Sequence, residues 1–235
     1  MSDLFSPEGF VHQSLLTAHI AAGSVALFAA PVALAVAKGS VAHRRAGWVY
    51  TGAMGFVAVS ALVMAIMKPK PFLLLLAVFA FYLSLTGVRM LRLKYRDAAK
   101  RAPELLDHAV AGVMAASAVG LLALSAWGLW RGEQFAVVYG VFGAISLFLV
   151  AGEGRARQLA ETDRKKWLSL HIQRMMAAYI STVTAFAAVN FGRWFPGISL
   201  IVTWLLPTAI GVPVIFFLIH RFVRAKKPGV IHVAE

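Results

Sequence analysis

Long apolar segments recur along almost the whole chain, and they constrain its fold more than any other feature. Runs of eighteen or more residues with few charges alternate with short charged segments. Such a run is long enough to cross the hydrocarbon core of a bilayer as an α-helix. Hydrophobic residues make up 60% of the 235 residues and charged residues only 14%, which is unlike a soluble domain. The sequence therefore predicts an all-α, polytopic membrane helix bundle.

Glycine, proline and charged clusters divide the apolar sequence into seven predicted transmembrane helices. The predicted spans are 14–37, 47–67, 71–93, 106–130, 135–152, 168–190 and 198–220. Together they predict one transmembrane domain, 14–220, between an extracytoplasmic segment, 1–13, and a basic tail, 221–235.

Lysine and arginine alternate sharply between the two sides of this predicted bundle. Of the 23 basic residues, 19 fall on one side and four on the other. The positive-inside rule then predicts an outside N-terminus and a cytoplasmic C-terminus, in a multi-pass protein of the bacterial inner (cytoplasmic) membrane. The net charge of +13 is thus explained mainly by the basic residues that set the orientation in the membrane, and it also favours contact with anionic lipid. No motif indicates nucleic acid, so the lipid bilayer is the predicted partner.

The chain contains no cysteine, and this restricts the cofactors that it can hold. Disulfides, thiolate-bound metals, cysteine-ligated iron–sulfur clusters and covalently attached c-type haem are all excluded. Histidine, carboxylate and methionine side chains remain as possible ligands.

The pattern His-x-x-Ala-Gly occurs three times, beginning at His19, His43 and His108. A glycine one helical turn from an imidazole lets a flat group or a neighbouring backbone approach the helix. His43, His108 and His171 each lie near the start of a span that enters from the cytoplasmic side, whereas His19 lies toward the outer side. A helix N-terminus favours neutral imidazole, the form that binds metal. We therefore expect these three histidines to converge on one site.

Other side chains near this site have both structural and functional interpretations. Met175 shares a helix face with His171, but packing explains a methionine there more readily than ligation. His43 and Arg44 fit interfacial anchoring as well as cofactor binding. Asp107 and Glu153 are candidates to bind a metal or to hydrogen-bond its ligands. The structural alternatives are that Asp107 caps its helix and that Glu153 lies in a glycine turn.

Three stretches, "HIAAG", "HRRAGWVY" and "HIQRMMAAYISTVTA", resemble the motifs of a bacterial family of predicted membrane proteins known as DUF2306. The matching positions are His19, then His43 with Arg44, Gly47 and Tyr50, then His171 with Met175. The resemblance covers the first, second and sixth spans and implies a membrane helix bundle with histidines, but no activity.

Three classes of function fit these features. The first is a haem b electron-transfer or quinone-linked redox protein, with a quinone or a redox protein as its partner and His108 and His171 as the preferred axial pair. His43 is then an alternative ligand, and Arg44, Arg45 or Arg174 could bind propionates. The second is a non-haem zinc, iron or copper centre of His43, His108 and His171. The third is a non-enzymatic accessory subunit or transporter, and the sequence leaves enzyme activity open.

Overall fold

The computed structural model describes residues 7–95, 103–163 and 165–224, and within these ranges it contains helices and no β-strand. The predicted all-α class is confirmed. In chain order the helices are α1 (Pro7–Ala35), α2 (Val41–Met67), α3 (Pro71–Arg89), the 3₁₀ helix η2 (Met90–Lys94), α5 (Leu105–Trp130), α6 (Ala136–Ala151), α7 (Glu153–Thr162), α8 (Lys166–Trp194), α9 (Leu200–Ile219) and the π-helical turn η3 (His220–Arg224).

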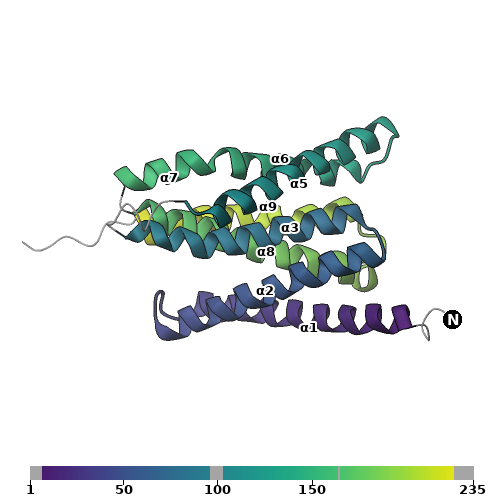
Figure 1. Cartoon of the computed structure of the whole chain (residues 1–235), viewed down its shortest axis with the longest axis horizontal. Coiled ribbons are helices and arrows are strands. Elements are labelled where there is room, and N and C mark those ends of the chain that lie inside the picture. The colour runs from purple at the N-terminus through teal and green to yellow at the C-terminus, as the bar shows by residue number, and fades with distance from the viewer. Residues whose placement is uncertain (1–6, 96–102, 164, 225–235) are drawn as a thin grey trace, which may run out of the picture.

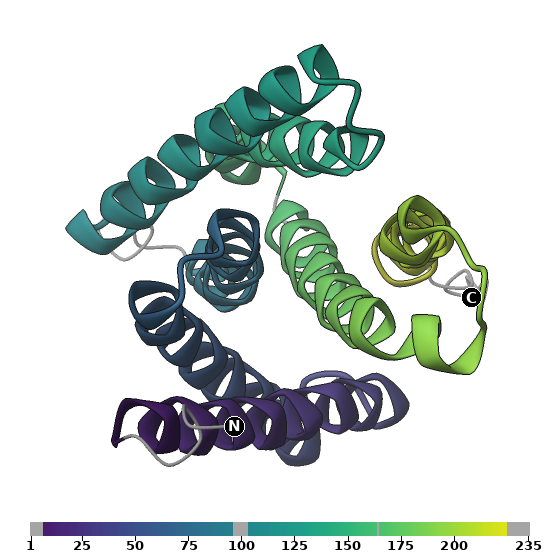
Figure 2. The ribbon, with the colours of Figure 1, turned by 90° about the vertical axis from the view of Figure 1, so that its right-hand side faces the viewer.

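The helices form three tiers that run roughly parallel to the long axis of the molecule (Figure 1). α1 and α2 make one outer tier, α3, α8 and α9 the middle one, and α5 with α6 the other outer tier, as the end view also shows (Figure 2). α3 packs against α2, α5 and α8, so it is the central helix of the bundle.

Six helices are long and apolar enough to cross a membrane, whereas the sequence predicted seven. The difference is the predicted span 135–152, which forms α6, a helix of 16 residues. At 1.5 Å per residue α6 is about 24 Å long, less than the roughly 30 Å of a hydrocarbon core. The polar helix α7 follows directly, and α6 with α7 runs back along the bundle toward the start of α8 (Figure 1).

The ends of the chain differ from the predicted domain boundaries. α1 begins at Pro7, so residues 7–13 are helical rather than part of a separate segment. Residues 1–6 and 225–235, which hold the rest of the two predicted terminal segments, lie outside the described residues.

One end of the bundle carries most of the described lysines and arginines, and we call it the basic end. It contains the α1–α2 loop, the end of α3, the start of α5 and the end of α9. Arg89 forms a bidentate ion pair with Asp107, through contacts of 2.5 Å and 2.7 Å, and a further bond to Glu104. Asp107 and Glu104 also form the capping box that starts α5, so this cluster joins α5 to the end of α3.

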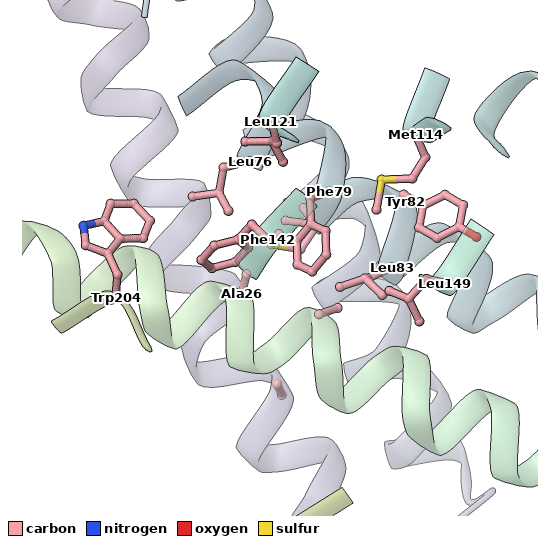
Figure 3. Packing of buried hydrophobic residues seen from close by; sticks show 14 of the residues in the cluster. Ala26, Leu76, Phe79, Tyr82, Leu83, Met114, Leu121, Phe142, Leu149 and Trp204 are labelled. Carbon is pink, nitrogen blue, oxygen red and sulfur yellow. The ribbon is translucent and has the colours of Figure 1, made fainter. Parts of the chain in front are cut away.

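The largest core cluster lies where the three tiers meet (Figure 3). Leu83, Met114 and Leu121 are fully enclosed in it. In contrast, large apolar side chains such as Phe28 and Phe148 are more than 70% exposed on the outer surface. Because water would disfavour so much exposed apolar surface, these faces suit contact with lipid.

Candidate functional site

His43 and His171 lie next to each other near the basic end. Their ring centroids are 6.5 Å apart, with an angle of 72° between the planes. His43 is in the first turn of α2, where Ser40 caps the helix by accepting a hydrogen bond from the His43 amide. His171 is in the second turn of α8. The structure thus brings together two of the three histidines that the sequence selected.

Each of these two rings is oriented by a backbone carbonyl of a neighbouring helix. His43 Nδ1 lies 2.9 Å from the carbonyl oxygen of Ala33 in the last turn of α1. His171 Nδ1 lies 2.7 Å from the carbonyl oxygen of Gly87 in the last turn of α3. A carbonyl can only accept, so both Nδ1 atoms donate, and a neutral ring then carries its lone pair on Nε2. Histidines that ligate metals through Nε2 are usually oriented in this way, with the other ring nitrogen donating to a carbonyl or a carboxylate.

The position of His171 depends on a close contact between α3 and α8. A Cβ atom added at Gly87 would lie 2.7 Å from Met175 Sδ and 3.2 Å from Arg174 Cβ. Only glycine allows this approach, and the approach brings the Gly87 carbonyl within reach of His171. Met175 therefore packs against α3, which agrees with the structural interpretation of this residue. Its role as a ligand stays a prediction.

The predicted convergence of three histidines does not occur. His108 is exposed on α5, and α5 lies in the outer tier opposite α2 (Figure 2). Within residues 7–95, 103–163 and 165–224, no group of three or more histidine, aspartate or glutamate side chains could hold a metal ion. The prediction was wrong because depth along the bundle is readable from the sequence, whereas the tier in which a helix packs is not.

Arg44, the other predicted site residue, is exposed. Its Nη1 atom donates to the carbonyl of Gly39 at 3.1 Å. Gly39 has a φ of +79°, a conformation that favours glycine, and the tight α1–α2 loop depends on it. Arg44 thus stabilises this loop, and no hydrogen bond or ion pair among the described residues joins its side chain to either histidine ring.

His19 has a partner of its own on the outer half of the bundle. Its Nδ1 lies 2.8 Å from Ser60 Oγ on α2, and Ser60 Oγ donates to the carbonyl of Phe56 at 2.7 Å. The Ser60 hydroxyl uses its single proton in that bond, so His19 Nδ1 is the donor. This contact joins α1 to α2, which gives His19 a structural role.

The glycines of the three His-x-x-Ala-Gly patterns contact no neighbouring helix. A Cβ atom added at Gly23, Gly47 or Gly112 would meet no atom within 4 Å. Packing within the chain therefore does not explain them. Gly47 follows His43 by one turn of α2, so open space lies beside the helix that carries this histidine.

Sequence reasoning missed a buried polar network on the other side of α8. Arg174 is 3% exposed, and its guanidinium carbon lies 5.0 Å from the centre of the Tyr82 ring. Tyr82 donates to the Glu153 carboxylate at 2.7 Å. Arg174 Nη2 donates to the carbonyl of Leu149 at 3.3 Å, while Nε and Nη1 are buried without a hydrogen-bond partner among the described residues.

The sequence indicated Glu153 and Arg174 separately, but it did not connect them through Tyr82; an arginine inside an apolar span usually faces the interior of a bundle. Tyr82 and Glu153 are 71 residues apart in sequence, so their contact depends on how α3 and α7 pack. The network fixes the junction of α6 and α7 against α3 and α8.

A hydrogen bond joins α2 to α8 deeper in the bundle. Tyr50 Oη and Thr182 Oγ1 are 3.1 Å apart, and Tyr50 is 1% exposed. Together with the histidine pair, this bond fixes the relative position of α2 and α8.

No model of a known protein family, no curated protein and no solved structure matches this chain.

Proposed function

We propose that this membrane protein binds haem b through His43 and His171 near the basic end and transfers electrons. The proposal rests on one observation: the two imidazole rings lie next to each other, and the Nδ1 atom of each donates to a backbone carbonyl. Both Nε2 atoms then remain as possible ligands, and no cysteine in the chain competes with them. Membrane helix bundles hold haem in this way, with imidazoles on facing helices.

The separation of the rings favours two ligands on opposite sides of one metal ion. With metal–nitrogen bonds of about 2.0–2.1 Å, opposed imidazoles have ring centres about 6 Å apart, and tetrahedral ones about 5 Å apart. The observed separation is 6.5 Å, closer to the opposed arrangement. Two imidazoles at this separation would suit one haem iron, which His43 and His171 would then hold as its protein ligands.

The number of ligands favours haem over the alternative of a non-haem metal. The macrocycle supplies four nitrogen ligands, so the chain has to supply only two, whereas a structural or catalytic zinc site uses three or four protein ligands. The described residues contain no third histidine or carboxylate in a suitable group.

In this proposal the chain's own residues orient the ligands and set their basicity. The carbonyls of Ala33 and Gly87 fix the tautomer of the two histidines, and open space beside Gly47 leaves room at the α2 side. Bound haem would supply one-electron chemistry, with a quinone or a redox protein at the membrane as the partner. Membership of a DUF2306-like family and a place in the bacterial inner membrane are part of the same proposal.

The test is the reduced-minus-oxidised absorption spectrum of the purified full-length protein, expressed with an ample haem supply. We expect a haem b signal in the wild type, and its loss or a change to high spin in H43A and H171A. H108A and H19A are the matched controls, and both should retain the wild-type signal. A wild type without haem would refute the proposal, and so would a signal that H108A removes and H43A does not.

A further inference from the structure

The α1–α2 loop and η3, the turn that directly follows α9, meet at the basic end around one aromatic side chain. Lys38 Nζ lies 6.0 Å from the centre of the Phe222 ring, and the guanidinium carbon of Arg221 lies 5.5 Å from the same centre. Two cations that are 183 positions apart in the sequence therefore share one ring. Arg44, in the first turn of α2, donates to the carbonyl of Gly39 in the loop that carries Lys38.

These cations gather positive charge, and none of them forms an ion pair with a carboxylate of the described residues. The four ion pairs between described side chains involve Arg89, Arg92 and Arg131, and none involves Lys38, Arg44 or Arg221. Burial and the nearby charge of Arg221 both lower the pKa of Lys38 from its ordinary value. Like charges held this close repel each other, and an anion bound between them would relieve the repulsion.

The ammonium group of Lys38 is held in place by the end of α1. It donates to the carbonyls of Ala33, Leu34 and Val36, which lie at the negative end of the helix dipole. Its charge is therefore fixed next to Arg221. Arg44 and Arg221, both exposed at the surface, offer guanidinium N–H groups that suit phosphate oxygens.

The surroundings of the cluster indicate a lipid rather than a free anion. Trp48 follows Arg44 by one helical turn on α2 and is 66% exposed, and Phe222 is 41% exposed. An exposed tryptophan beside a cation is typical of the interface between headgroups and acyl chains. Apolar faces of α1, α2 and α9 continue from this point toward the middle of the bundle, where acyl chains would lie.

We propose that Lys38, Arg44 and Arg221 form a binding site for the phosphate headgroup of an anionic phospholipid. The site adjoins the histidine pair, because the Ala33 carbonyl accepts from both Lys38 Nζ and His43 Nδ1, but the contacts proposed for the headgroup do not involve haem. The headgroup would join the start of α2 to the end of α9, two segments that have no ion pair between them among the described residues.

Native mass spectrometry of the full-length protein in detergent, titrated with phosphatidylglycerol or phosphatidylcholine, tests the site. The wild type should bind phosphatidylglycerol more tightly than phosphatidylcholine. Each of K38Q, R44Q and R221Q should weaken phosphatidylglycerol binding by about fivefold, because each removes one lipid-facing charge. The charge-conserving variant K38R/R44K/R221K should retain the preference for phosphatidylglycerol. This control separates the loss of charge from a disturbance of the fold.

The matched control is K68Q/K70Q/R193Q, which removes the same number of charges at the opposite end of the bundle. This control should keep the wild-type preference. Equal binding of both lipids by the wild type would overturn the site. The triple variant K38Q/R44Q/R221Q should lose the preference. If the control lost as much affinity as this triple variant, the site would also be overturned, because binding would then depend on net charge alone.

Discussion

The contact at Gly87 gives the most direct test of how α3 and α8 position His171. In a G87A variant the new Cβ would lie 2.7 Å from Met175 Sδ, 3.0 Å from Met175 Cγ and 3.2 Å from Arg174 Cβ. The Met175 side chain is flexible and can rotate away. Arg174 Cβ is attached to the α8 backbone, so α3 and α8 must separate by a few tenths of an ångström.

The expected magnitude follows from two opposing effects. Overpacking of this kind costs about 1–3 kcal/mol, and alanine in place of a helical glycine returns about 1 kcal/mol. We expect G87A to lower the free energy of unfolding by up to about 2 kcal/mol. The 2.7 Å bond from His171 Nδ1 to the Gly87 carbonyl lies at this contact, so the orientation of His171 should change as well.

The assay is denaturant unfolding of the full-length protein in detergent micelles, with G23A and G112A as controls. An added Cβ at either control position meets nothing within 4 Å, so both variants should be as stable as the wild type or more stable by up to about 1 kcal/mol. In G87A/M175A the loss should be smaller than the sum of the two single losses, by about 0.5–3 kcal/mol. G87A with the stability of the controls, or strictly additive losses, would refute the reasoning.

Three further predictions concern the buried network, pH and topology. Y82F removes the hydroxyl that donates to the buried Glu153 carboxylate and should destabilise the protein by about 1.5–3 kcal/mol, measured in the same unfolding assay. Hydrogen bonds from Arg89 and then Arg92 lower the pKa of Glu104, so its stabilising effect is present above the ordinary glutamate pKa and is lost as pH falls through the lowered value. The melting temperature of E104Q should therefore fall less steeply on acidification than that of the wild type, and parallel curves would contradict this. A reporter fused to the C-terminus should be active only in the cytoplasm, and periplasmic activity would reverse the predicted orientation.

The sequence by itself determined the helical membrane architecture and much of its layout. Apolar runs of sufficient length must satisfy their backbone hydrogen bonds internally, so helices were the expected solution. The predicted span 135–152 was wrong because Phe135 and Gly152 lie outside the helix, and the 16 residues that remain in α6 are too few to span a membrane alone. The sequence also selected His43 and His171, because imidazoles at the start of apolar helices are costly without a role.

Only the tertiary structure decided which of the candidate side chains meet. Depth in the bundle follows from position along a helix, but the packing order of the helices depends on contacts between distant segments. This order placed α5, with His108, in the tier opposite α2. The ring of His171 is oriented by a backbone carbonyl 84 residues away, and no residue type in the sequence signals such a partner.

The glycines show the same division between sequence and tertiary structure. The repeated pattern drew attention to Gly23, Gly47 and Gly112, which face open space, whereas the close helix contact is at Gly87, outside any repeat. Because glycine has no side chain, its role cannot be predicted from side-chain chemistry. Its contribution is the space that it leaves, and only the neighbouring helix decides whether that space is used.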